Sequence, residues 1–361
     1  MKKLLIASAA LAMVAGTVQA QSSVTISGRI DQSVGSHDIG TAGQGNVGKV
    51  NSNVYATSRI TFAGVEDLGG GLKAGFFLET GMSPDTGGSG SVTGVSGTTG
   101  TNTFFSRESN MYVSGGFGEI RVGKITTDAT DSDVFVNATA SHVAGMNQAL
   151  VGKRIGGVAG AAATGIDSLG DNSDNTVAYK LPTFSGATVQ LFRAEGENTG
   201  GYDTGSTNGA SVRYVNGKLK ATAAQVSKKI STGKSQDQTS YGLSYDFGMV
   251  RVGAVQVVSD YTETTPNDKA KATVLSAAVP VNAKITLVGA YHTAKNDLGS
   301  AYDGKATVVG ATYDFSKRTA AYVTYAASKN EASGNYSVSG MTGTTAGADE
   351  KLTSVGIKHF F

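Results

Sequence analysis

The chain has 361 residues, with 50 glycines, 4 prolines and no cysteine, and its formal net charge is +2. Without cysteine there is no disulfide framework, thiol chemistry or thiolate metal site, and the balanced charge gives no reason to expect nucleic acid as a partner. A mean hydropathy near zero excludes a protein built from membrane-spanning helices.

Residues 1–20 have the pattern of a secretory signal. They combine two early lysines, an apolar run over 4–15 that is too short to span a bilayer, and a small-residue cleavage site. We expect cleavage between Ala20 and Gln21, which leaves one domain over 21–361. Removing Lys2 and Lys3 leaves 28 basic residues against 28 acidic ones, so the mature chain is neutral.

The rest of the chain alternates between apolar and polar residues in short runs, which indicates β-strands with one apolar face. Val24, Ile26 and Ile30 are predicted to share one face of a strand, for example, while Arg29 and Asp31 share the other. Two kinds of connection separate the runs. Tight turns rich in Gly, Pro or Asn are predicted at 67–71, 115–118, 182–186, 216–217, 247–249, 280–282 and 315–317. Long polar loops are predicted at roughly 36–54, 81–103, 126–173, 198–207, 229–237, 260–270, 296–302 and 330–349.

Seven tight turns that alternate with eight long loops imply sixteen strands, with both chain ends on the short-turn side. An even number of strands with short turns on one side and long loops on the other is the pattern of bacterial outer-membrane barrels. Sixteen strands leave a water-filled lumen, whereas about eight would be filled by side chains. The predicted fold is therefore an all-β, sixteen-stranded antiparallel transmembrane barrel located in the cell outer membrane.

The last strand supports this interpretation. Val355, Ile357, His359 and Phe361 share one face, and the chain ends on the aromatic Phe361. A lipid-facing row that alternates with a lumen-facing row is required of a transmembrane strand. The alternative is a secreted two-sheet sandwich or β-solenoid, which would also be rich in alternating strands.

Several segments resemble the Gram-negative general porins of the β-proteobacterial group. They are QSSVTI (21–26), SRITFAG (58–64), EDLGGGLKA (66–74), GGFG (115–118), RVGK (121–124) and VGIKHFF (355–361). The resemblance covers the whole mature chain, and the order and spacing of the segments carry it. One departure is Phe360, where such endings more often have Lys or Arg.

The resemblance implies a homotrimeric porin whose third outer loop, here roughly 126–173, folds inward and narrows the pore. It implies passive diffusion of small hydrophilic solutes and inorganic ions. The expected partners are outer-membrane lipid, lipopolysaccharide and the barrel-assembly machinery, for which Phe361 would be the signal. No cofactor is expected.

Charged residues suggest which part of the pore selects between anions and cations. Arg29, Arg59, Lys73 and Arg121 fall on the predicted inner face of the first five strands, and Asp128, Asp131 and Asp133 open the long loop. A basic wall opposite an acidic loop would set up a transverse field at the narrowing. We predict a mild preference for anions from this placement. Alternatively these side chains are ordinary wet lumen residues that pair with Asp31, Glu79 and Glu119.

Other functions find less support in the sequence. No metal site is expected, because the acidic groups at 128–133 and 171–174 lack the glycine and terminal glutamate of a calcium loop. No catalytic motif stands out, so we expect no enzyme. Lys153 and Arg154 could line the pore or bind the wall. An adhesin with a plugged lumen remains the rival interpretation, and the position of loop 126–173 separates the two.

Overall fold

The structure is a computed structural model. It describes residues 23–40, 45–89, 104–129, 131–139, 172–197, 204–231, 233–262, 268–334, 336, 338 and 345–361. The predicted signal, with its cleavage site at Ala20 and Gln21, lies outside these residues. Among the described residues, no helix has the length and apolarity needed to cross a membrane.

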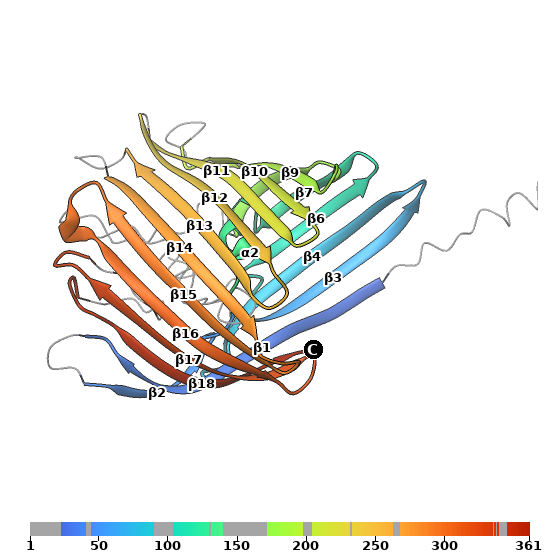
Figure 1. The fold of residues 1–361 in the computed structure, drawn as a ribbon. Coiled ribbons are helices and arrows are strands. Elements are labelled where there is room, and N and C mark those ends of the chain that lie inside the picture. Colours follow the sequence, from blue (N-terminus) through green and yellow to red (C-terminus); the bar gives the residue numbers. More distant parts are fainter. Residues whose placement is uncertain are drawn as a thin grey trace, which may run out of the picture.

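Antiparallel strands form most of the described chain (Figure 1). The first half contains β1 (Ser23–Asp38), β2 (Val47–Ser52), β3 (Ser58–Gly69), β4 (Leu72–Ser83), β5 (Gly88–Ser89), β6 (Glu108–Gly115), β7 (Gly118–Ile125), β8 (Ser173–Lys180) and β9 (Ala187–Ala194). The second half contains β10 (Thr207–Asn216), β11 (Leu219–Ser231), β12 (Lys234–Asp246), β13 (Arg251–Tyr261), β14 (Asp268–Pro280), β15 (Ile285–Asn296), β16 (Gly304–Asp314), β17 (Thr319–Asn330) and β18 (Lys351–Phe360). Two short helices, α2 (Ser132–Val136) and η1 (Ser300–Tyr302), lie in connections.

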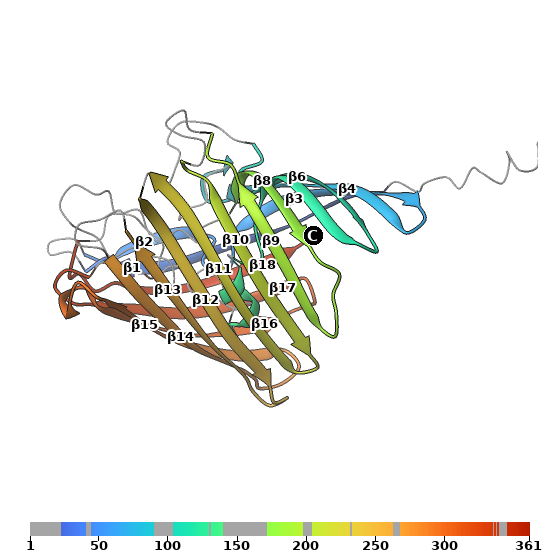
Figure 2. The same cartoon turned by 90° about the horizontal axis from the view of Figure 1, so that it is seen from above.

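The strands form a closed barrel with sixteen positions, as the sequence predicted. β2 and β3 both pair with β1 and share one position in the ring, and β5 is a two-residue extension paired with the end of β4. The other strands pair with their neighbours in chain order, and β18 returns to β1. Figure 2 shows the same ring from above. Because β1 pairs with both β18 and β3, the ring of described strands has no free first or last strand, which is the condition for spanning a bilayer with strands.

The ring closes at the last residue of the chain. The amide N of Phe361 donates to the carbonyl O of Gly28, and the amide N of Gly28 donates to the carbonyl O of Phe361, both at 3.1 Å. The Phe361 ring lies over Gly28, where a Cβ atom would come within 2.6 Å of Cζ. Glycine at position 28 therefore leaves the space in which the terminal aromatic ring packs.

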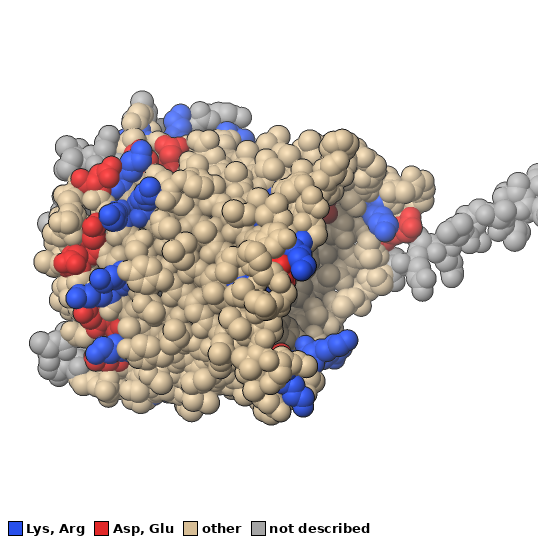
Figure 3. Space-filling view, in the orientation of Figure 1, with Lys and Arg blue, Asp and Glu red and all other residues tan. Residues whose placement is uncertain are grey.

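A broad band of the outer surface is free of charged side chains (Figure 3). On strands β12–β15 and β17, exposed apolar residues alternate with inward residues; among the exposed ones are Leu243, Val252, Leu275, Leu287 and Val323. Near the short turns, Tyr245 packs on Phe247 with ring centroids 4.6 Å apart, and Tyr313 packs on Phe315 at 5.1 Å. An apolar belt bordered by aromatic residues is what a lipid-facing barrel surface presents.

The connections follow the predicted alternation of short turns and long loops, with two clear differences. The segment predicted as a loop at 36–54 contains the end of β1 and the whole of β2, and these two strands pair with each other. The segment predicted as a loop at 229–237 is mostly strand, because β11 continues to Ser231 and β12 begins at Lys234. Gly233 has a φ of +72°, which allows a tight hairpin. The polar residues here thus belong to a hairpin that extends the sheet.

Candidate pore constriction

A cluster of arginines surrounds one buried carboxylate on the inner wall of β3 and β4. Arg59 Nη1 lies 2.8 Å from Glu79 Oε1, and Arg107 Nε lies 2.7 Å from the same oxygen. Thr61 Oγ1 donates to Glu79 Oε2 at 2.9 Å. Strand alternation turns residues 59, 61 and 79 to the same side, and the register sets Thr61 opposite Glu79. Arg59 and Thr61 therefore reach Glu79 from the same face of the wall.

Arg29 extends this cluster across β1. The register pairs it with Arg59, and its Nε donates to the carbonyl O of Thr57 at 2.7 Å. Arg29 forms no ion pair with any described residue. Arg29, Arg59 and Arg107 thus bring three positive charges to a part of the wall that also holds two buried carboxylates, Glu79 and Asp31, and this excess favours anions.

Arg107 was not among the predicted site residues. It stands in a bend before β6 begins, so strand alternation gives no guide to its direction. Its backbone N donates to the carbonyl O of Glu79 at 3.1 Å, and this contact turns the side chain into the cluster. No signal in the local sequence identifies that contact.

Two of the residues predicted to line the constriction, Lys73 and Arg121, lie apart from the cluster. Lys73 is exposed at the short-turn end of β4, opposite Asp67 in the register. Arg121 is held by Glu119 at 2.9 Å and by Glu108 at 3.8 Å, and its guanidinium carbon lies 5.1 Å from the centre of the Tyr112 ring. Arg121 is therefore largely neutralised by neighbours on its own wall.

The long loop after β7 begins by folding inward. The carboxylate of Asp128 forms ion pairs with Arg213 Nη1 and Lys180 Nζ, both at 3.0 Å. Its amide N donates to Gln190 Oε1 at 2.7 Å. These partners lie on β8, β9 and β10, so Asp128 fastens the loop to the wall. Asp131 starts α2 by accepting the amide N of Phe135 at 3.0 Å on its carbonyl. The side chain of Asp133 and the whole of Lys153 and Arg154 lie outside the described residues.

Helix α2 docks on the inner wall of β11–β13, where two glycines make room for it. A Cβ atom at Gly242 would come within 2.6 Å of Val136 Cγ2, and one at Gly253 within 2.4 Å of the Val136 carbonyl O. The amide N of Ala138 donates to Ser276 Oγ at 2.9 Å, and Arg251 Nη2 donates to the Ala138 carbonyl at 2.9 Å. The described start of the loop therefore crosses the inside of the barrel.

Inward-facing cations outnumber inward-facing carboxylates on the described walls. The cations are Arg29, Arg59, Arg107, Arg121, Lys180, Arg213, Lys220, Arg251 and Lys358. The carboxylates are Asp31, Glu79, Glu108, Glu119, Asp128, Asp314 and Glu350. No group of His, Asp or Glu side chains suited to a metal ion occurs in the described part of the chain.

Comparisons with known proteins give the same architecture. The profile of the Gram-negative porin family matches residues 7–333. Outer membrane porin protein 32 of Delftia acidovorans is 33% identical over the whole length of both chains. The major outer membrane protein P.IB of Neisseria gonorrhoeae is 28% identical and aligns with 90% of this chain and 92% of its own.

Solved structures agree with this assignment. The anion-selective porin from Comamonas acidovorans superposes with a TM-score of 0.75 at 26% identity, covering 94% of this chain and 100% of that one. The trimer form of OmpT from Vibrio cholerae has the same fold, with a TM-score of 0.64 at 16% identity over 94% of this chain and 99% of its own. The chain belongs to the Gram-negative porin family and is an outer-membrane porin.

Proposed function

We propose that this porin conducts small hydrophilic solutes by passive diffusion and prefers small anions, without catalysing a reaction. The observation that carries the proposal is the cluster of Arg29, Arg59 and Arg107, whose three positive charges exceed those of the two neighbouring carboxylates, Glu79 and Asp31. Guanidinium groups stay charged at any working pH, and the low-dielectric wall focuses their field into the water beside it.

The inner wall formed by β8–β13 adds to the preference for anions. Arg213 and Lys180 share Asp128, and Arg251 and Lys220 lie beside α2. The predicted acidic loop therefore opposes the basic wall less than expected, because Asp128 is already paired. The anion-selective porin from Comamonas acidovorans, similar over nearly the whole chain, supports this direction of selectivity.

The inward course of residues 126–129 and 131–139 favours a channel over an adhesin. This segment docks against the inner wall through Val136 and Ala138. A loop that bound partners outside the cell would instead project from the barrel mouth. Size exclusion at the narrowing and charge bias from the walls together describe the proposed mechanism.

The test is the reversal potential of single channels in a planar bilayer across a KCl gradient. The Debye length is about 10 Å at 0.1 M salt and about 3 Å at 1 M. We therefore expect chloride to be preferred at low salt and the preference to fade at high salt. A pore that prefers potassium at low salt would contradict the proposal.

We also propose that the porin assembles as a homotrimer. Support comes from the trimer form reported for OmpT, which has the same fold, and from the exposed apolar residues Val24, Ile26 and Met111 on the first strands. Conductance should rise in groups of three equal steps. Cross-linking in native outer membranes that yields only monomers would contradict this assembly.

A further inference from the structure

The wall strand formed by β2 and β3 contains more residues than its neighbour can pair. Between the pairs Gln32–Ser52 and Arg29–Arg59, β1 advances by three residues while its partner advances by seven. Four residues are therefore surplus to the ladder and must leave the plane of the sheet. We call residues 53–57, which contain this surplus, the inner bulge.

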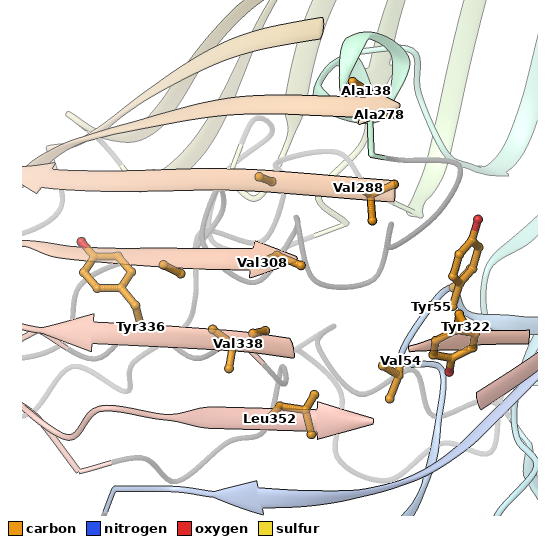
Figure 4. Close-up of a cluster of buried hydrophobic side chains, with 14 of the residues drawn as sticks. Val54, Tyr55, Ala138, Ala278, Val288, Val308, Tyr322, Tyr336, Val338 and Leu352 are labelled. Atoms are coloured by element: carbon orange, nitrogen blue, oxygen red, sulfur yellow. The ribbon is translucent and has the colours of Figure 1, made fainter. Parts of the chain in front are cut away.

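The inner bulge points into the barrel. Tyr55 is only 2% exposed, and its ring centre lies 5.5 Å from that of Tyr322 on the inner face of β17. The Nζ of Lys358, which is on the inner face of β18, lies 3.7 Å from the centre of the Tyr55 ring. Figure 4 shows Tyr55 and Tyr322 together on the inside of the wall, with Val54 beside them. The bulge therefore occupies lumen space next to the seam of the barrel.

The carboxylate of Asp31 fixes the inner bulge in place. Its Oδ2 accepts the amide N of Tyr55 at 2.5 Å and that of Ala56 at 2.9 Å, and its Oδ1 accepts the hydroxyl of Tyr322 at 2.7 Å. Asp31 is 1% exposed, so these bonds replace its hydration. Hydrogen bonds to a buried charge are among the stronger ones in proteins. A segment held in this way keeps its shape.

The first residue of the bulge is fixed as well. Asn53 adopts a φ of +67°, its amide N donates to the Asp31 carbonyl at 3.1 Å, and its side chain donates to the Met82 carbonyl at 3.0 Å. Its own Oδ1 accepts the amide N of Ser58 at 2.7 Å, where β3 begins. Both ends of the bulge are thus tied to the wall, and only its middle extends inward.

The inner bulge and α2 approach the lumen from opposite sides. In the ring order, β12 beneath α2 lies half-way round from β3. The carbonyl O of Thr57, the last residue of the bulge, accepts the Nε of Arg29. The bulge therefore takes up cross-section and also positions one of the arginines of the cluster.

We propose that the inner bulge is a second constriction element, built into the wall and clamped by Asp31, which limits the size of permeating solutes together with the long third loop. This rests on the channel function and is independent of the anion preference. Asp31 and Tyr55, both buried, are then positioning residues that hold the bulge inside the barrel.

The main test removes Val54, Tyr55, Ala56 and Thr57, which restores equal residue numbers on the two strands. Folding is checked by the heat-modifiable mobility of the barrel on gels. Single-channel conductance and the entry of neutral sugars of increasing mass into proteoliposomes are then compared with those of the wild type. We expect higher conductance and entry of sugars that the wild type excludes.

Point variants keep the test decisive if the deletion does not fold. Tyr55→Ala removes the ring that packs between Tyr322 and Lys358 and leaves the backbone contacts of Asp31, so the bulge should settle toward the wall and the pore should admit larger sugars. Its control is Tyr325→Ala, which removes the same side chain from the outward face of β17, where Tyr325 is 41% exposed. Asp31→Asn should release the bulge and give noisy, variable conductance, whereas Asp38→Asn, at the end of β1, should not.

The outcomes separate the hypotheses. A folded deletion variant, or failing that a folded Tyr55→Ala variant, with wild-type conductance and sugar cut-off would overturn the role of the bulge. A folded wild type without conductance would instead overturn the channel function. Because neutral sugars report size alone, loss of the anion preference would leave this test unaffected.

Discussion

The two halves of the inner wall have different chemistry. Across β1, β3 and β4 the inward residues are charged and hydrogen-bonded, with Arg59 and Glu79 as the clearest pair. Across β13–β17 no charged pair of this kind occurs among the inward residues of the described strands, and many of those residues are small, apolar and inaccessible to solvent, interspersed with buried polar residues such as Ser276, His292 and Thr312. The apolar set comprises Val255, Val257, Ala272, Val274, Ala290, Ala306, Val308 and Ala326.

The contents of the barrel explain the difference. Val136 of α2 clusters with Val255, Val257 and Val274, and Tyr336 and Val338 from the last loop belong to the same cluster as residues on β15–β18 (Figure 4). These inward segments displace water from the wall that they cover. A lumen-facing side chain in a wide barrel is therefore polar where water reaches it and apolar where a loop packs on it.

Among the residues of the charged wall, Glu79 should be the one whose substitution lowers the stability of the barrel most. Glu79→Ala leaves Arg59 and Arg107 facing each other without their carboxylate. Removing one partner of a buried pair costs about 3 kcal/mol where the other partners still touch water. We expect a lower urea midpoint in detergent and a reversal potential shifted toward chloride. An unchanged midpoint would show that the cluster does not stabilise the wall.

On the apolar wall, substitution of the glycines beneath α2 should have the largest effect on how the helix docks. Gly253→Val places side-chain atoms against the Val136 carbonyl, and overpacking of this kind costs about 1–3 kcal/mol. Helix α2 should then leave the wall and become accessible to protease. Gly289→Val is the control, because the nearest atom to its Cβ is 3.8 Å away. Equal protection of α2 in both variants would mean that these glycines do not seat the helix.

Charge reversal within the basic wall should distinguish unpaired from paired arginines. Arg29 forms no ion pair with a described residue, whereas Arg121 is held by Glu119 and Glu108. Arg29→Glu should therefore move the reversal potential toward potassium more than Arg121→Glu does, when both are measured at low salt. The opposite order would place Arg121, and not Arg29, at the narrowing.

The smallest expected effect concerns Asp128, on the side of the pore that the loop covers. Asp128→Asn removes the charge that Arg213 and Lys180 share, so both cations are left uncompensated. We expect a slight shift toward chloride at about 0.1 M salt that disappears near 1 M, where screening is complete within about 3 Å. A shift toward potassium would contradict the pairing.

Strand number, turns and the alternating outer face could be predicted from the sequence, because these follow from local patterns such as Asn216-Gly217 and the row ending at Phe361. The apolar inner wall also leaves a local signal. The run from Val252 to Val258 is nearly continuous in apolar residues, which indicates burial on both faces.

Other features depend on contacts between distant residues and could not be predicted. Arg107 joins the cluster through a backbone bond to Glu79, and Asp128 finds its partners on strands that begin about fifty or more residues later. The inner bulge arises from a mismatch between two registers on β1, which no single segment encodes. Lys73 has the correct alternation but the wrong height along its strand to join the arginines.

The seam between β1 and β18 has a consequence for the order of folding. It pairs Arg29 with Phe360, so nearly the whole chain lies inside the loop that this contact closes. Closing such a loop costs about 3 kcal/mol more in chain entropy than closing one of about ten residues. The hairpins should therefore form first and the seam last. Until then two strands carry unpaired N–H and C=O groups that hydrocarbon cannot accommodate, so closure and entry into the bilayer must proceed together.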